Sequence, residues 1–331
     1  MPAIISRRNA LKALGGMGAL AVAPLSLSAC GGSSNPSDKT YKIGVLQLTE
    51  HDALDAANKG FIAALDESGL KYEADQQNAQ NDQSACQTIA SKLVNDGNDL
   101  ILAIATPAAQ AVVGATTDIP IVGTAITDFQ KAGLVKDNDK PGGNVTGSSD
   151  LTPVEDQFDL LKQLFPDAKK VGVLYCTAES NSDIQADMAK DAAKSHNLEV
   201  QEFTVSSSNE IQQVVESMVG KVDVCYCPTD NTIAAGMKTV MMVATENKLP
   251  VINAEEGQVR NGGLVTYGIN FETLGHMAGE MAVKILKGEA KPADMPIEHE
   301  DKDQYTLVAN QQTAKDLGVD LSVLGDKVTF V

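Results

Sequence analysis

The chain has 331 residues, 43% hydrophobic and 21% charged, an ordinary composition for a globular protein with one large core or two smaller ones. Its 44 acidic residues outnumber its 26 basic residues, and the formal charge is −18 at neutral pH. Nucleic acid requires a surface rich in Lys and Arg, so this balance excludes nucleic acid as the partner.

The first 29 residues have the composition of an export signal. They contain Arg7, Arg8 and Lys12 but no acidic residue, and a run of small apolar residues follows at 14–27. The arginine pair fits a twin-arginine signal and an ordinary secretory signal equally well, so the export route stays open.

The end of this signal, Leu27-Ser28-Ala29-Cys30, resembles a bacterial lipobox, in which the cysteine is acylated; the alternative is a plain signal with an accidental cysteine. Residues 30–40, rich in Gly and Ser, then form a flexible tether. We therefore expect an extracytoplasmic protein that is anchored to the bacterial cell membrane through Cys30.

The four other cysteines contain no C-x-x-C pair, and we interpret them as small buried hydrophobic residues: Cys86, Cys176, Cys225 and Cys227. A bridge from Cys176 to Cys225 or Cys227, between neighbouring strands, is the alternative.

From residue 41 onward, strand and helix patterns alternate over short intervals, which predicts an α/β fold with parallel sheets. The first half contains the predicted strands 42–48, 71–75, 99–105 and 119–123. The pair Thr106-Pro107 predicts a helix start with Thr106 as the N-cap. Residues 131–150 lack a helical period, so we place the crossing to a second lobe there.

The second half begins with Thr152-Pro153-Val154-Glu155, which combines a cap, a first-turn proline and a capping-box acid. Its predicted strands are 170–176, 198–204, 222–227 and 249–252, and its predicted helices are 182–195, 209–219 and 231–247. The strand 264–269 and the helix 272–287 are predicted to return to the first lobe. The predicted division is 41–145 plus 268–296 for lobe one and 146–267 plus 297–331 for lobe two.

The two halves repeat each other. Residues 42–46 recur as residues 170–174, and each copy is followed by a capping-box spacing, Thr49 to Asp52 and Ser180 to Asp183. Residues 98–100 match 222–224, and residues 119–122 match 249–252, in the same way. Three matched pieces in the same order indicate an internal duplication into two similar lobes, with Thr106 opposite Asp230.

Polar residues gather where the predicted strands end, which is where open parallel sheets bind ligands. The candidates are Thr49, Glu50, Thr106, Asp128, Ser180, Asn181, Asp230, Asn231 and Glu255. Such a cluster suits a small ligand with a carboxylate and an ammonium group, such as an α-amino acid. The alternative is that Thr49, Thr106 and Ser180 only cap helices, and that Glu50 and Glu255 are solvated rim residues.

Signals of enzymes are mostly absent. The sequence has no P-loop and no G-x-S-x-G elbow, and its four histidines are scattered without the spacing of metal ligands. We expect no cofactor and no metal site. His51 lies in a candidate site loop, where it can donate a hydrogen bond to a ligand.

Several segments resemble the ABC-importer substrate-binding lipoproteins of the tryptophan/tyrosine type. They include residues 47–55, 105–111, 127–135, 143–147, 228–232 and 267–271. The resemblance implies a type I periplasmic-binding-protein fold, whose two Rossmann-like lobes close on a ligand and deliver it to an ABC permease and its ATPase. It implies that the best site residues are Thr106, Asp128, Asn181, Asp230 and Asn270. A sensory receptor of the same fold and an extracytoplasmic enzyme are the alternatives.

Overall fold

The computed structural model describes residues 39–331. The predicted export signal, Cys30 and all but the end of the predicted tether lie outside the described residues. Within 39–331, no helix combines the length and the apolar character that crossing a membrane requires.

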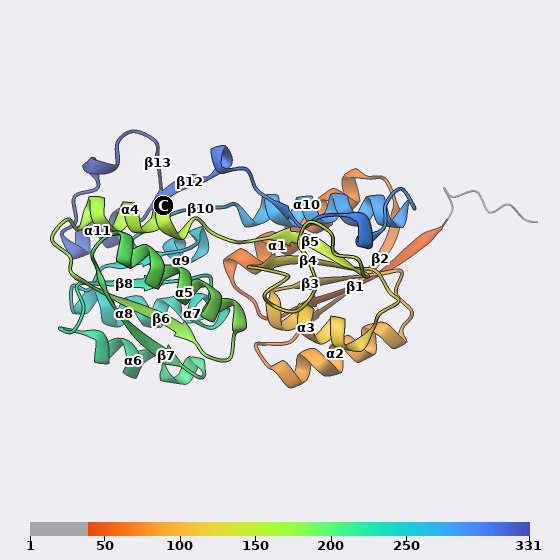
Figure 1. The fold of residues 1–331 in the computed structure, drawn as a ribbon, viewed down its shortest axis with the longest axis horizontal. Helices are drawn as coiled ribbons and strands as arrows, with labels where there is room; N and C mark the ends of the chain where they lie inside the picture. The colour runs from red at the N-terminus through yellow and green to blue at the C-terminus, as the bar shows by residue number, and fades with distance from the viewer. Residues whose placement is uncertain (1–38) are drawn as a thin grey trace, which may run out of the picture. The chain divides into compact units, whose positions relative to one another are not determined.

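The described part of the chain forms two sheets (Figure 1). The first sheet has the order β11-β5-β4-β3-β1-β2, and its paired strands are all parallel. Its strands are β1 (Thr40–Gln47), β2 (Lys71–Asn78), β3 (Leu100–Ile104), β4 (Ile121–Ile126), β5 (Val145–Ser149) and β11 (Glu298–His299).

The second sheet has the order β13-β12-β10-β9-β8-β6-β7 and is parallel except where β12 pairs with β10. Its strands are β6 (Lys170–Cys176), β7 (Glu199–Val205), β8 (Val224–Cys227), β9 (Val251–Asn253), β10 (Val265–Gly268), β12 (Thr306–Ala309) and β13 (Val328–Phe330).

Strands β1 to β5 have the order β5-β4-β3-β1-β2 in the first sheet, and β6 to β10 have the matching order β10-β9-β8-β6-β7 in the second. This agreement confirms the predicted duplication. The Asp99 carboxylate accepts a hydrogen bond from the Lys42 N–H at the start of β1, and Asp223 does the same for Lys170 at the start of β6. The carbonyls of Pro120 and Pro250 accept matching hydrogen bonds from β3 and β8. Two Rossmann-like lobes, each with its own sheet, therefore form this fold.

Helices cover both faces of each sheet. The first lobe carries α1 (Asp52–Glu67), α2 (Gln83–Asn95), α3 (Thr106–Ala115) and α10 (Phe271–Leu286). The second carries α4 (Val154–Leu164), α5 (Ser180–Ser195), α6 (Ile211–Met218), α7 (Asn231–Ala235), α8 (Met237–Glu246), α9 (Glu256–Arg260) and α11 (Gln311–Leu317).

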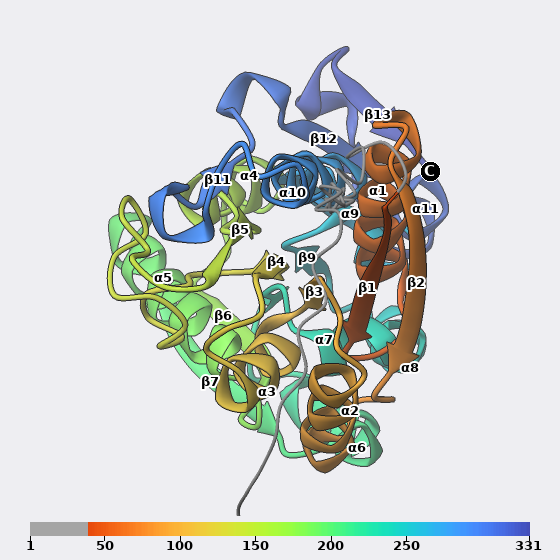
Figure 2. The same cartoon turned by 90° about the vertical axis from the view of Figure 1, so that its right-hand side faces the viewer.

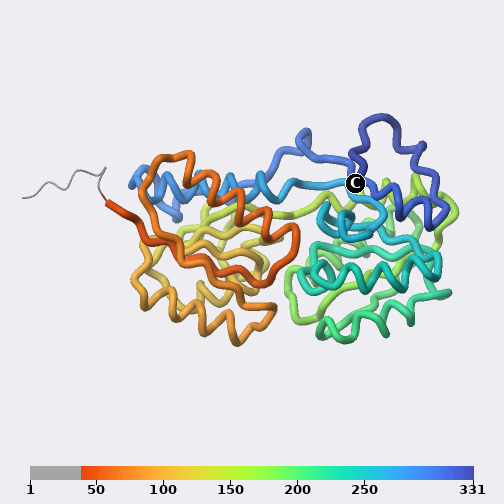
Figure 3. The backbone as a smooth tube through the Cα atoms, turned by 180° about the vertical axis from the view of Figure 1, so that it is seen from behind, coloured from red at the N-terminus to blue at the C-terminus, as the bar shows by residue number. Residues whose placement is uncertain are grey.

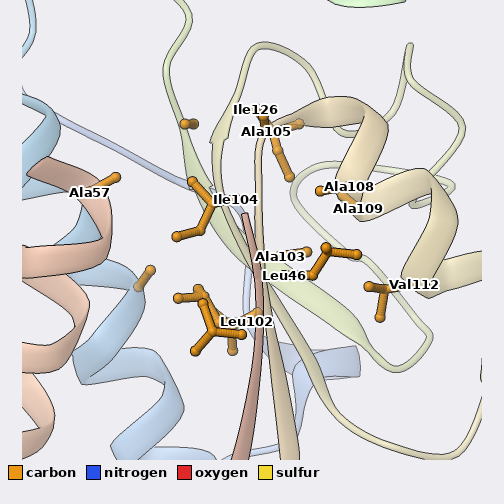
Figure 4. Close-up of a cluster of buried hydrophobic side chains, with 14 of the residues drawn as sticks. Leu46, Ala57, Leu102, Ala103, Ile104, Ala105, Ala108, Ala109, Val112 and Ile126 are labelled. Carbon is orange, nitrogen blue, oxygen red and sulfur yellow. The ribbon is translucent and has the colours of Figure 1, made fainter. Parts of the chain in front are cut away.

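The central strand β3 is buried on both faces, as its continuous apolar sequence predicts. Figure 4 shows Leu102 and Ile104 on the side of Ala57 in α1, and Ala103 on the side of Val112 in α3. The strand thus joins two helical layers into one core.

The chain crosses between the sheets three times, after β5, after β10 and after β11 (Figure 3).

The predicted boundary placed residues from 146 on in the second lobe, but Val145–Ser149 is β5, which pairs with β4 in the first sheet. This strand is only five residues long and contains Gly and Ser, so its sequence carries little strand signal. The predicted return of the whole strand 264–269 to the first lobe is wrong, because β10 pairs with β9 in the second sheet. The predicted division after residue 267 falls at the end of this strand. Only α10, which follows it, packs on the first lobe.

Several predicted helix caps are wrong. Thr106 is the first residue of α3 and Ala105 occupies the N-cap position. Ser180 lies inside α5, whose N-cap is Glu179, and α1 begins after His51 rather than Thr49. Pro153, not Thr152, precedes α4, and the predicted helix 231–247 divides at Gly236 into α7 and α8.

The four cysteines within 39–331 are buried and free, as the interpretation as small hydrophobic residues predicts. Cys225 and Cys227 point to the same face of β8, with their sulfur atoms 3.8 Å apart.

Candidate functional site

The two lobes meet through hydrogen bonds at the carboxyl ends of their strands. Asn81 donates to the Thr232 hydroxyl at 2.9 Å, and Gln83 donates to the Ala178 carbonyl at 2.8 Å. Asn261 of the second lobe donates to the Asp52 carboxylate of α1 at 2.9 Å. The strand ends that sequence reasoning selected therefore face each other.

The centre of this contact is a buried polar cluster formed by Thr127, Asp150, Asn181, Gln185 and Thr229, which we call the central cluster. Gln185 in α5 donates to the Thr127 hydroxyl at 3.0 Å and also to the Thr229 hydroxyl. Asn181 donates to the Thr229 carbonyl at 3.1 Å. Residues that follow β4 and β5 in one lobe and β8 in the other are thus joined into one polar site.

Asp150 directly follows β5 and its side chain is buried. Its Oδ1 atom has no hydrogen-bond partner within residues 39–331. Burial raises the pKa of this carboxyl to about 7, and the Thr127 hydroxyl opposes the rise. A buried carboxylate with a free oxygen is costly unless a cation or donor pairs with it.

The helix α3 starts just after β3, the strand that pairs with β4 on the side away from β5. Thr106 is buried, and its hydroxyl lacks a hydrogen-bond partner in the described part of the chain. Ala105 before it has φ 82° and ψ 153°, a conformation that is essentially confined to glycine. Ala125, near the end of the adjacent β4, also has a positive φ of 56°. Backbone strain of this kind clusters at ligand sites, and the first turn of α3 presents N–H groups that suit an anion.

In the second lobe, two carboxylates organise the start of α7. Glu179 accepts hydrogen bonds from the backbone N–H and the side chain of both Asn231 and Thr232. Asp230 accepts from the Cys176 N–H at 2.6 Å, the Ser182 hydroxyl at 2.7 Å and the Ile233 N–H at 2.8 Å. Burial and the Glu179 charge raise the pKa of Asp230 to about 8. Asp230 therefore joins β6 to α7 inside one lobe.

His51 joins this arrangement from the first lobe, because its Nε2 atom lies 3.1 Å from the Asn231 Oδ1 atom. Its Nδ1 atom is buried and has no hydrogen-bond partner among the described residues. Burial lowers the pKa of His51 from its ordinary value of 6.5.

Three other predicted residues make hydrogen bonds with neighbouring protein groups. The Thr49 carbonyl accepts a hydrogen bond from Gln47 within the first lobe. The Ser180 hydroxyl is 3.3 Å from the Gln110 amide nitrogen of α3. Glu255 caps α9 by accepting from the N–H groups of Gly257 and Gln258, and burial raises its pKa to about 8.

Two predicted residues cap local structure, and a third is exposed. Asp128 accepts hydrogen bonds from Gln130 N–H and Lys131 N–H and so caps a turn. Asn270 is the N-cap of α10, and its side chain accepts from the Thr273 N–H. Glu50 is exposed.

Sequence reasoning missed Asp150 and Gln185. Residues 145–149 contain Gly and Ser and carry little strand signal, so the sequence does not mark Asp150 as a residue at a strand end. Gln185 lies in the second turn of α5, where no local pattern distinguishes it from a solvent-facing glutamine. Across 39–331, no group of three acidic, His or Cys side chains is arranged to hold a metal ion.

Comparison with known proteins gives three related findings. A family model described as "ABC transporter substrate binding protein" matches residues 42–325. A "Tyrosine-binding protein" of Clostridioides difficile is 47% identical over 299 residues, covering 89% of this chain and 86% of the relative. An ABC domain from Streptococcus pneumonia in complex with L-Trp is 42% identical, with a TM-score of 0.85, and the match covers 88% of this chain and all of that one.

A ligand-free, open substrate-binding protein with adhesive properties from Clostridium difficile is more similar in sequence, at 47% identity. The match covers 88% of this chain and 99% of that one, yet the TM-score is only 0.67. The structure is therefore more similar to the complex with L-Trp than to the open form, in agreement with the hydrogen bonds that join the two lobes.

Proposed function

Because the chain belongs to the ABC transporter substrate binding protein family, we propose that it captures an aromatic L-amino acid between its lobes for import. The observation that carries this proposal is the unpartnered, buried oxygen of Asp150 in the central cluster. An α-ammonium group supplies the positive charge and the donors that this carboxylate requires. The names of two relatives, one tyrosine-binding and one solved with L-Trp, favour an aromatic side chain.

The start of α3 suits the carboxylate of the same ligand. Free N–H groups in the first helical turn and the unpartnered Thr106 hydroxyl provide donors for an anion. Thr106 follows β3 and Asp150 follows β5, with β4 between them in the sheet (Figure 2). An α-amino acid places its two charged groups on one carbon atom, so with a hydrogen bond at each group it can reach both strand ends across the end of β4.

The second lobe contributes Asn181, and Gln185 beside it joins the two lobes through Thr127. The Asn181 Oδ1 atom also lacks a hydrogen-bond partner within 39–331, which leaves an acceptor for the ligand. A ligand held by both lobes favours the closed arrangement over the open one, because it gains contacts only when the lobes meet.

The proposal extends to the membrane. A lipid anchor at Cys30 holds the protein outside the cytoplasm, and an ABC permease with its ATPase receives the ligand unchanged. Replacing Cys30 with Ala is expected to move the protein from the membrane fraction to the soluble fraction without changing ligand affinity. Mass spectrometry of the released ligand tests whether it leaves unaltered.

Titration calorimetry of residues 37–331, which form one compact unit, tests the ligand class. L-Tyr and L-Trp are expected to bind, whereas tyramine, which lacks the carboxylate, and the desamino acid of tyrosine are not. Asp150→Asn removes the charge opposite the ammonium and is expected to lower affinity by about 30-fold or more, or roughly 2 kcal/mol. Asp128→Asn is the matched control, because that carboxylate has partners within its own lobe: the Gln130 and Lys131 N–H groups, the Asn138 side chain and the Lys131 ammonium. Equal effects of the two variants would remove Asp150 from the site.

A further inference from the structure

We infer that His51 selects ligands that carry a hydrogen-bond donor on their side chain, with its Nδ1 atom as the acceptor. This inference rests on the proposed function, since it names which aromatic amino acids the site prefers. The phenol of tyrosine and the indole of tryptophan each carry one donor, and the phenyl ring of phenylalanine carries none.

The first step is the orientation of Asn231. Its Nδ2 atom donates to Glu179 Oε2 at 2.6 Å, and a carboxylate oxygen can only accept. The amide nitrogen therefore faces Glu179, and the Oδ1 atom faces His51. Glu179 is itself held by Thr232, so this orientation is fixed within the second lobe.

The second step is the tautomer of His51. Since Asn231 Oδ1 can only accept, His51 Nε2 must be the donor in the 3.1 Å contact. In the neutral ring the proton is then on Nε2 and the lone pair is on Nδ1. The charged groups around the ring are Glu179 of the second lobe and Asp52 and Asp55 of α1, and burial outweighs them, so the pKa of His51 is lowered. At neutral pH the ring thus presents a buried acceptor.

The third step is the position of this acceptor. Along the edge of the first sheet, the order is β5 with Asp150, β4 with Thr127, β3 with Thr106, and then β1 with His51. Neighbouring strands are separated by about 4.8 Å, so the strands of Asp150 and His51 are about 14 Å apart. That separation leaves room for an amino acid with a long side chain and a hydrogen bond at each end.

A cavity of about 220 Å³ lies between the lobes. It is lined by Leu48 of the same loop as His51, by Pro107 of α3, and by Glu179 and Thr232, which fix Asn231.

The experiment compares the dissociation constants of L-Tyr, L-Trp and L-Phe for residues 37–331 by calorimetry at pH 7.5. L-Tyr and L-Trp are expected to bind at least about 10-fold more tightly than L-Phe, because L-Phe leaves the buried acceptor without a donor. In His51→Leu the preference is expected to fall to within about threefold. The affinity for all three amino acids is expected to fall as well, because the hydrogen bond to Asn231 between the lobes is lost. His51→Asn places a carbonyl oxygen near the position of Nδ1 and is expected to restore the preference.

His276→Leu is the matched control, since this histidine pairs with Glu67 away from the lobe contact. Wild-type protein that binds L-Phe as tightly as L-Tyr would overturn the inference and leave the proposed function intact. So would a His51→Leu variant, shown to be folded by its melting curve, that keeps the full preference. If none of the three amino acids binds, the proposed function fails instead.

The pH dependence of the preference shows whether the His51 Nδ1 atom accepts a hydrogen bond from the ligand or the ring only packs against it. Acidification protonates Nδ1, so the preference for L-Tyr over L-Phe is expected to disappear as the pH falls below the lowered pKa of His51. A preference that is constant from pH 8 to pH 4.5 would contradict an Nδ1 acceptor.

Discussion

The side-chain amide of Gln185 in the second lobe donates a 3.0 Å hydrogen bond to the Thr127 hydroxyl in the first. Its carbonyl oxygen accepts a 3.1 Å hydrogen bond from the buried Thr229 N–H. The buried Gln185 side chain therefore makes one hydrogen bond between the lobes and another that holds the chain just after β8.

The first prediction concerns this side chain. Gln185→Leu removes the contact to Thr127 and leaves a buried N–H unsatisfied, which costs about 1–3 kcal/mol. Affinity for the ligand is expected to fall about 10- to 100-fold in calorimetry. The ligand-induced decrease in radius of gyration, measured by X-ray scattering, is expected to become smaller.

The control for that variant is Gln110→Ala. Gln110 also contacts the other lobe, at Ser180, but through a solvent-exposed hydrogen bond of 3.3 Å that water can replace. Its loss is expected to change affinity by less than about threefold. Comparable losses in the two variants would show that closure does not depend on the buried amide.

The second prediction concerns ligand affinity and pH. Burial raises the pKa of Asp150 to about 7, and the ionised form pairs with the ligand ammonium. Binding therefore releases a proton below pH 7, so affinity is expected to rise about tenfold per pH unit up to about pH 7 and then level off. L-Phe is the suitable ligand, because it has no ring donor for His51. Calorimetry in buffers of different ionisation enthalpy measures the released proton, and a flat profile in wild-type protein would contradict this account.

The third prediction concerns the contact of α1 with α10, which lie side by side over the first sheet (Figure 2). A Cβ atom on Gly275 would lie 1.8 Å from the Ala57 carbonyl oxygen, so the two helices would have to separate. Gly275→Ala is expected to lower the free energy of unfolding by about 3 kcal/mol or more. Urea denaturation measures the change.

Gly114→Ala in α3 is the matched control for that substitution. A Cβ atom there meets no atom within 4 Å, and alanine favours the helix by about 0.5–1 kcal/mol. If both variants were equally stable, the close approach of α1 and α10 would not contribute to stability.

The fourth prediction concerns stability and pH. Burial raises the pKa of Glu255 from 4.5 to about 8, so the folded protein retains a proton that the unfolded chain releases. This contribution is fully present below pH 4.5 and is lost as the pH rises to 8. Glu255→Gln retains a neutral side chain and is expected to gain stability relative to wild type between pH 5 and pH 9, measured by urea denaturation. Glu256→Gln, at a surface ion pair with Arg260, is expected to show no such trend.

Local sequence predicted most of the fold. Hydrophobic runs such as Leu100–Ile104 identified buried strands, because a strand covered on both faces needs apolar residues at every position. The prediction was wrong at Val145–Ser149, where Gly and Ser form a strand that is buried by its neighbours rather than by its own side chains. Two predicted helix caps were also wrong. Thr106 and Ser180 are the first residues of their helices, and Ala105 and Glu179 occupy the N-cap positions.

The candidate site was predicted in outline only. Strand ends carry ligand sites in any open parallel sheet, so residues such as Thr106 and Asn181 could be selected from their place in the pattern. The same pattern could not separate them from Asp128 and Asn270, whose carboxylate and amide groups cap a turn and a helix. That distinction depends on which polar atoms find partners after folding.

The sequence by itself determined the doubled α/β architecture, because strand and helix periodicities and the matched segments are local properties of the chain. Only the tertiary structure decided that Asp150, Gln185 and His51 all lie at the junction of the lobes, and that the Nδ1 atom of His51 is buried without a partner among the described residues. Burial, hydrogen-bond partners and tautomers arise from residues far apart in the chain, such as His51 and Asn231, and no local pattern encodes them.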